Sequence, residues 1–183
     1  MRYAASVEYE GTNFFGWQRQ SSVNSVQEEI ENSISQITQT NIKIQGAGRT
    51  DAGVHALGQV FHFDTDIIRP LNSFIKGANS FLPDSIRVKW AKSVTDDFHA
   101  RFSATGREYQ YLLNNASVNS SIWSNHCGWT FYELDPDLLK NASKKFEGCH
   151  DFTAFRSSEC QSKSPIRSIE NIKVEKFNNY YLF

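Results

Sequence analysis

The sequence predicts an α+β fold in which two halves each follow the order β-α-β-β-α-β. Three observations support this prediction. Apolar and polar residues alternate as in strands near the N-terminus and near residues 60 and 88. Apolar residues recur every three to four positions, as in helices, between those strands. The second half begins with the same pattern, but the 183 residues include no counterpart of its last helix and strand, so we expect it to be incomplete. The alternative is a protein whose second unit is half the size of the first.

Each element of the first half has its own signal. Residues 3–9 alternate as a strand, and a capping box of Ser25 and Glu28 starts a helix whose apolar residues recur from Val26 to Ile37. Short strands are expected at 42–45 and 58–63. A second helix is expected from Pro70 to Pro83, and Ile86, Val88 and Trp90 alternate as a fourth strand. This order is the split unit of ferredoxin-like and RRM-like folds, with helices on one face of a mixed, mainly antiparallel sheet. The other face is then expected to stay available.

The second half has weaker signals. Residues 107–113 alternate as a strand, Asp135 and Pro136 open a helix that Gly148 ends, and residues 169–177 resemble a strand. Asn178 and Asn179 are expected to form the turn into a hairpin partner. We place the boundary between the halves at 97/98, with the N-terminal half and its loop at 1–97 and the incomplete half at 98–183.

The composition indicates which ligands, which kinds of site and which location to expect. The net charge of −1 gives no global attraction to nucleic acid or membrane, so a polyanion would need a local basic patch. The 14 Phe, 7 Tyr and 4 Trp exceed the needs of a plain core, so we expect some rings to serve as stacking surfaces. Cys127, Cys149 and Cys160 lack the paired spacing of a zinc site or a disulfide framework, which favours reduced thiols in the cytoplasm. No signal core or membrane span is evident.

The stretch GAGRTDAGVHALGQVFHF, residues 46–63, contains the most informative loop. Its small residues leave room for a ligand to come close, and Asp51 can project from among them. An ionised carboxylate near the guanidinium of Arg49 can act as a nucleophile. The alternatives are a turn-forming or helix-capping Asp51 and an Arg49 in a surface ion pair.

Two alternatives to the aspartate nucleophile stay open, a hydrolase and a noncatalytic RNA-binding module. His55 lies four residues after Asp51, so a hydrolase with an Asp-His dyad is conceivable, although a loop histidine more often makes a structural hydrogen bond. A noncatalytic RNA-binding module on the same sheet is the other alternative. Residues 98–111 interleave arginine and histidine with aromatic rings, a mixture that contacts phosphates and stacks on bases, or that forms a half-buried strand with a basic face.

Six motifs in order, VEYEGTNFFGWQRQ, SVQEEIE, GAGRTDAGVHALGQVFHF, DDFHARFSATGREYQYLL, DFTAFR and CQSKSPIR, resemble the tRNA pseudouridine synthase A family over nearly the whole chain. The resemblance implies the pseudouridine-synthase fold. It also implies isomerisation of uridine to pseudouridine at positions 38 to 40 of the tRNA anticodon stem-loop, through a flipped base and an aspartate nucleophile. No metal or organic cofactor is implied, and the full-length family is expected to be homodimeric.

The resemblance also assigns roles to residues. Asp51 matches the essential aspartate, Arg49 the arginine that holds the nucleotide out of the stack, and Tyr109 the tyrosine that packs on the target base. The expected substrate-binding residues are Tyr109, Arg19, His55, Phe98, His99, Ala100, Arg101, Phe102, Glu159, Cys160, Gln161, Ser162 and Lys163. The family carries a later arginine that pairs with the aspartate. We therefore expect these 183 residues alone to have little synthase activity and the full-length protein to be active.

Overall fold

The computed structural model of the chain describes residues 1–156 and 164–183. The chain forms two compact units, Met1–Arg107 and Glu108–Phe183. The elements of the first unit are β1 (Arg2–Tyr9), α1 (Val26–Thr38), β2 (Ile44–Gly46), β3 (Ala56–Asp64), the π-helical turn η1 (Ser73–Gly77), α2 (Ala78–Phe81) and β4 (Ile86–Val94). They follow the predicted β-α-β-β-α-β order, and the α+β fold class is confirmed.

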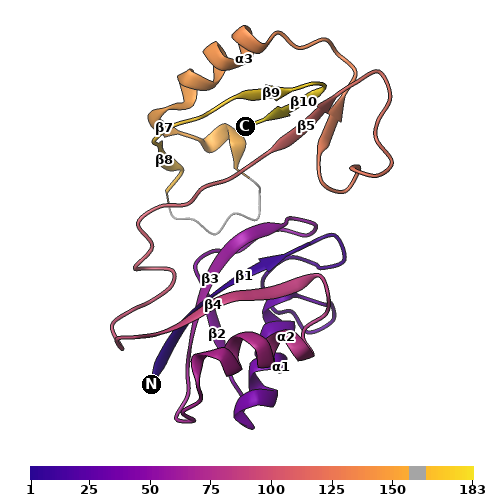
Figure 1. Cartoon of the computed structure of the whole chain (residues 1–183). Coiled ribbons are helices and arrows are strands. Elements are labelled where there is room, and N and C mark those ends of the chain that lie inside the picture. Colours follow the sequence, from indigo (N-terminus) through magenta and orange to yellow (C-terminus); the bar gives the residue numbers. More distant parts are fainter. Residues whose placement is uncertain (157–163) are drawn as a thin grey trace. The chain divides into compact units, whose positions relative to one another are not determined.

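The sheet of the first unit has the strand order β2-β3-β1-β4, and all neighbouring strands are antiparallel. Helices α1 and α2 cover one face of this sheet (Figure 1). Between the helices and the sheet lies a core of fully buried side chains, the largest of which include Phe61, Phe63, Phe74, Ile30, Ile34, Ile86 and Val7. The sheet and its helices therefore form a stable base for the loop between β2 and β3.

The N-terminus of α1 has the predicted cap. Ser25 has extended backbone angles, and its side-chain oxygen accepts a hydrogen bond from the N–H of Glu28 at 3.3 Å. At the other end Gln39 takes a left-handed conformation with φ 56°. Both ends are thus set by residues next to the helix.

Strand β4 differs from the prediction at Trp90. The register between β1 and β4 shifts between Ser6 and Val7, so Ser6 pairs with Trp90 and Val7 with Val88. The extra residue is a bulge, and it moves the next core position to Ala91, which is 6% exposed. Trp90 is therefore half-buried opposite Ser6 and does not belong to the core cluster.

The second face of the sheet is covered at β1, contrary to the expectation that it stays available. Ala4 is 2% exposed and Ser6 is 4% exposed. Part of the cover is the segment after β4. Arg2 donates from Nη1 to the carbonyl oxygens of Asp96 at 2.6 Å and Phe98 at 2.8 Å, and the Ala100 N–H donates to Nδ1 of His62 at 3.2 Å.

The second unit contains β5 (Leu112–Asn115), β6 (Gly128–Thr130), α3 (Pro136–Ser143), the 3₁₀ turns η2 (Lys144–Phe146) and η3 (Thr153–Phe155), β7 (Gly148–Asp151), β8 (Ile166–Ile169), β9 (Glu175–Phe177) and β10 (Tyr180–Leu182). Its sheets have the orders β6-β5-β10-β9 and β7-β8. The predicted cap at Asp135 and the hairpin turn at Asn178, with φ 52°, are both present.

Two strand predictions for this unit were wrong in their bounds. The first strand begins at Leu112 rather than at 107, and the stretch 169–177 contributes to two strands that pair with different partners, β8 with β7 and β9 with β10. Alternation alone does not show where pairing partners begin. Among the described residues of this unit only Asn114, Val174 and Tyr181 are buried, and none of them is in α3. In the described part of the chain, no helix is long and apolar enough to cross a membrane.

Candidate active site

The loop between β2 and β3 carries Asp51, whose side chain is exposed together with those of Arg49 and Val54. Thr50, between Arg49 and Asp51, is half-buried. The loop leaves the sheet at Gly46 and returns to it at Ala56, so both of its ends are held by strand pairing with β3 and β1. Asp51 thus lies in the middle of a short connection between two paired strands.

The main chain on both sides of Asp51 is hydrogen-bonded. The carbonyl oxygen of Thr50 accepts from the N–H of Trp17 at 3.0 Å, and the carbonyl oxygen of Asp51 accepts from the N–H of Val54 at 3.2 Å. The hydroxyl groups of Tyr9 and Thr50 are 2.8 Å apart and bonded to each other. The backbone that carries the exposed carboxylate is therefore ordered by its neighbours.

Additional contacts hold the start of the loop. The Ala47 N–H donates to the Val60 carbonyl oxygen at 2.8 Å, and Nε2 of Gln59 donates to the Gly48 carbonyl oxygen at 2.6 Å. Nη2 of Arg107 donates to the Ala47 carbonyl oxygen at 2.7 Å. Arg107 thus supports the loop, a role that the basic and aromatic pattern of residues 98–111 did not reveal.

Close backbone packing beneath Asp51 requires a glycine at position 16. Gly16 has φ +88°, and a Cβ atom there would lie 2.5 Å from the Thr50 carbonyl oxygen and 3.2 Å from the Asp51 carbonyl carbon. Only glycine combines this conformation with such an approach. The motif FFGWQRQ therefore supplies the surface on which the loop lies.

Arg49 and Asp51 do not form an ion pair with each other within the described parts of the chain. They belong to the same exposed loop, two residues apart. The predicted proximity of the two groups in the chain is thus not a direct contact in this structure. Arg49 is exposed on this loop, and the role that the resemblance implies for it stays a prediction.

His55 has a different environment from the one that a catalytic dyad needs. Its Nδ1 accepts a hydrogen bond from the Gly11 N–H at 3.0 Å and lies 3.5 Å from Oε1 of Glu10. The structural hydrogen bond, one of the two alternatives for this histidine, is therefore present. Among the described residues, no hydrogen bond or ion pair joins His55 to Asp51.

Arg19, expected to face RNA, lies beside a buried carboxylate. Its Nη1 is 3.1 Å from Oε2 of Glu31, which is 3% exposed, and 41% of the Arg19 side chain remains exposed. The same arginine lines an open hollow with Gln20, Ser21 and Glu28. Arg19 thus has a structural partner and an exposed edge.

Residues 98–102 form an ordered turn with an exposed tip. Nδ1 of His99 accepts from the N–H groups of Arg101 at 3.2 Å and Phe102 at 3.4 Å. The rings of His99 and Phe102 are 4.3 Å apart, and the Arg101 guanidinium lies over the Phe102 ring at 5.6 Å. Because Phe102 is 76% exposed, this turn presents a cation and a ring together at the surface.

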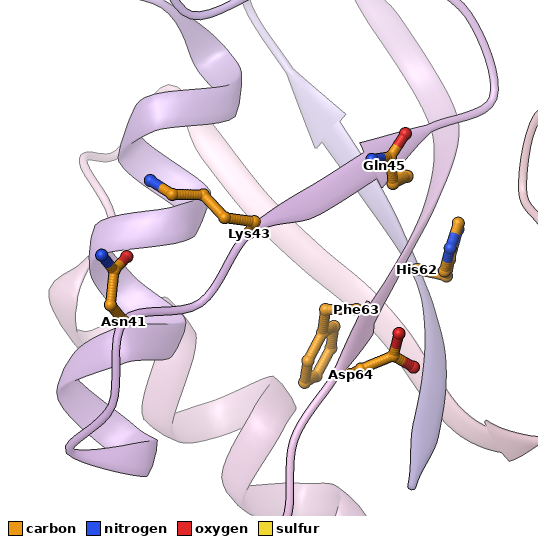
Figure 2. Close-up of a pocket in the computed structure, with 6 residues that line it drawn as sticks. All are labelled: Asn41, Lys43, Gln45, His62, Phe63 and Asp64. Carbon is orange, nitrogen blue, oxygen red and sulfur yellow. The ribbon is translucent and has the colours of Figure 1, made fainter.

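His62 holds that turn by accepting the hydrogen bond from the Ala100 N–H, and the sequence analysis did not identify this role of His62. Burial is the main cause that lowers the pKa of His62, and the nearby His99 and Arg2 lower it further. Figure 2 shows His62 and Asp64 projecting from β3, whereas Phe63 points to the side of the helices, where it packs against Phe74. These three residues line an open hollow together with Asn41, Lys43 and Gln45. No residue of 47–55 lines this hollow.

The other expected site residues divide into two groups. Tyr109 belongs to the second unit and is 80% exposed. Glu159, Cys160, Gln161, Ser162 and Lys163 lie outside the described residues. Sequence reasoning missed Tyr9, Trp17 and Thr50 as supports of the loop. The position of Tyr9 could have identified it. It is a tyrosine on the covered face at the last position of a strand, and a buried phenol needs a hydrogen-bond partner.

Comparisons with known proteins match the motifs that surround this loop. A family described as tRNA pseudouridine synthase matches residues 5–103 and 142–182. A protein of Nitrosomonas eutropha named tRNA pseudouridine synthase A is 45% identical over 183 residues, 100% of this chain and 66% of that protein. Proteins of the same name from Pseudoalteromonas atlantica and Shewanella frigidimarina are 46% and 44% identical, over 98% and 100% of this chain and 68% and 70% of their own lengths.

The chain thus spans about two thirds of the length of these relatives. The matched residues include the loop with Asp51, the strands that hold it and the turn at 98–102. This extent of similarity, together with the confirmed α+β fold, shows that the chain belongs to the tRNA pseudouridine synthase family.

Proposed function

We propose that the protein isomerises uridine to pseudouridine in tRNA and that Asp51 is its catalytic carboxylate. One observation carries the proposal. The side chain of Asp51 is exposed, whereas the main chain on both sides of it is hydrogen-bonded. Such order is what catalysis by a positioned carboxylate requires. Membership in the family supplies the reaction.

The reaction requires the base to leave the stack, at a cost of a few kcal/mol. The bond between N1 and C1′ breaks, the base turns, and a bond forms between C5 and C1′. The C5 hydrogen leaves as a proton and N1 gains one, so the product has the same atoms as the substrate. Asp51 attacks C1′ or C6 of the base, or assists a glycal route, and Tyr109 packs on the base and takes the C5 proton.

Arginines and rings supply the binding of RNA in this proposal. Arg49 holds the nucleotide out of the stack, and the exposed Arg101 and Phe102 contact a phosphate and a base. The resemblance also assigns tRNA contacts to Arg19 and to residues 159–163. The finer proposals are uridines 38 to 40 of the anticodon stem-loop as targets, a homodimer for the full-length protein, and a cytoplasmic location.

Release of tritium from tRNA labelled at C5 of uridine tests the proposal. Asp51→Asn should lower release by more than about a thousandfold while tRNA affinity stays within about twofold, because the amide keeps the size but not the nucleophilicity of the carboxylate. The exposed Asp66→Asn is the matched control and should be as active as the unchanged chain.

Two proteins should be assayed in excess over tRNA. One is the 183-residue chain and the other is a fusion that adds the part of the Nitrosomonas eutropha relative that this chain does not span. We expect the fusion to release more tritium. Equal release by Asp51→Asn and the unchanged protein would contradict the assignment of Asp51, and binding without release by both proteins would favour the noncatalytic RNA-binding module.

A further inference from the structure

We infer that Tyr9 and Thr50 are positioning residues, whose paired hydroxyl groups fix the main chain from which Asp51 projects. The inference rests on the proposed function, because it gives these two residues a task in placing the catalytic carboxylate. Tyr9 is the last residue of β1 and Thr50 directly precedes Asp51, so the bond joins an inner strand of the sheet to the loop.

The environment of Tyr9 makes this hydrogen bond important. Tyr9 is 2% exposed, and its oxygen lies 2.8 Å from Oγ1 of Thr50. A buried phenol without a hydrogen-bond partner destabilises the folded state, so this bond favours the observed position of Thr50. Burial also raises the pKa of Tyr9, which keeps the phenol neutral and able to donate.

Thr50 is held at a second point, and that point controls Asp51 directly. The carbonyl oxygen of Thr50 belongs to the peptide group that leads into Asp51, and the Trp17 N–H donates to it at 3.0 Å. The peptide group that leaves Asp51 is bonded through its own carbonyl oxygen to Val54. Rotation about the two backbone bonds of Asp51 would break one of these contacts or the bond to Tyr9.

The carboxylate itself has no such support. No hydrogen bond or ion pair to the Asp51 side chain occurs among the described residues. Its position before substrate binds therefore depends on the main chain and on its own side-chain rotamers. A reacting group that is displaced by about 1 Å loses much of its catalytic advantage, so the supports of the main chain are expected to matter for rate.

Two pairs of variants test the inference in the 183-residue chain. Tyr9→Phe and Thr50→Val each remove one hydroxyl with little change of shape. Thr50→Ser keeps the hydroxyl. Tyr3→Phe removes a phenol hydroxyl from a tyrosine of the same strand that is equally buried, and among the described residues this hydroxyl donates a hydrogen bond only to Met1 Sδ, at 3.9 Å. All four variants should keep the cooperative unfolding of the unchanged chain, which circular dichroism checks.

Amide hydrogen exchange measured by NMR reports the order of the loop. The amides of Trp17 and Val54 should exchange roughly fivefold faster in Tyr9→Phe and Thr50→Val, as expected for loss of a hydrogen bond of about 1 kcal/mol. In Thr50→Ser and Tyr3→Phe both amides should exchange at the rate of the unchanged chain. Unaltered exchange in both Tyr9→Phe and Thr50→Val overturns the inference.

Formation of pseudouridine in a single turnover reports the catalytic consequence. The rate at saturating chain should fall in Tyr9→Phe and Thr50→Val, with tRNA affinity unchanged and with recovery in Thr50→Ser. A loss of affinity instead of rate also overturns the inference. If neither the unchanged chain nor the fusion that extends it forms product, the proposed function fails, and the exchange rates still decide whether the hydroxyl pair orders the loop.

Discussion

Arg19 and Glu31 form an ion pair, with Nη1 and Oε2 3.1 Å apart, in which the arginine is half-exposed and the glutamate is buried. Glu31 also accepts hydrogen bonds from Nε2 of Gln27 at 3.0 Å and from the Ile44 N–H at 3.1 Å, and Lys43 is its second ionic partner. One carboxylate on α1 thereby connects the loop before the helix with the start of β2. The strand that leads into the candidate catalytic loop depends on this connection.

Glu31→Ala should lower the free energy of unfolding by about 2–3 kcal/mol, because it leaves the buried N–H of Ile44 without an acceptor and two cations without their partner. Glu31→Gln should cost only about 1 kcal/mol, since its amide oxygen can still accept from Ile44. Urea denaturation followed by circular dichroism measures both. The exposed Asn32→Ala, on the same helix, is the control, and a loss in Glu31→Ala no larger than in this control would contradict the prediction.

Gly16 and Gly53 both have positive φ but differ in their surroundings. A Cβ at Gly16 would meet the Thr50 carbonyl oxygen at 2.5 Å, whereas nothing lies within 4 Å of a Cβ at Gly53. Gly53→Ala should therefore cost about 1 kcal/mol for the left-handed conformation alone, and Gly16→Ala clearly more, about 3 kcal/mol or above. Thermal denaturation compares the two, and equal losses would show that the loop does not lie tightly on residue 16.

His62 should make the stability of the first unit depend on pH. Burial lowers its pKa, with further contributions from His99 and Arg2 that oppose a second positive charge, while Asp64 and the Gln45 carbonyl act in the opposite direction. The unfolded chain therefore binds a proton more readily than the folded chain. Stability is complete above the ordinary histidine pKa of about 6.5 and falls as the pH decreases below it.

His62→Asn tests this dependence, because an asparagine oxygen can accept the Ala100 N–H in place of Nδ1 without titrating. Urea denaturation between pH 5 and 8, in the range where histidine titrates, should show a weaker loss of stability toward acid than in the unchanged chain. His150→Asn, at an exposed histidine of the second unit, should leave the loss as it is. The same slope in the unchanged chain and in His62→Asn would refute a role for His62.

The second unit should be the less stable of the two. Among its described residues only three are buried, and none of them is in α3. The first unit, in contrast, has a continuous core under its whole sheet. Because apolar burial is the main stabilising contribution, the amides of β5 and β10 should exchange at least about tenfold faster than those of β1 and β4. NMR of the 183-residue chain measures this, and equal protection in both sheets would contradict it.

The sequence by itself determined the elements whose signals are local. The capped start of α1 at Ser25, the start of α3 at Asp135 and the hairpin turn at Asn178 were predicted from one to four neighbouring residues and are present. The order of elements in the first unit followed from periodicity. The family, too, was evident from the motif around Asp51, because that motif is long and continuous.

Only the tertiary structure decided which groups meet across the chain. Three features join residues that are far apart in the sequence: the bulge in β4 that displaces Trp90, the cover over Ala4, and the bond between Tyr9 and Thr50. Alternation within a strand indicates one covered face, but it does not show what lies on the second face or where register shifts. The reason is physical: periodicity reports burial along one element, whereas hydrogen bonds and packing between elements depend on a register that the whole sheet sets together.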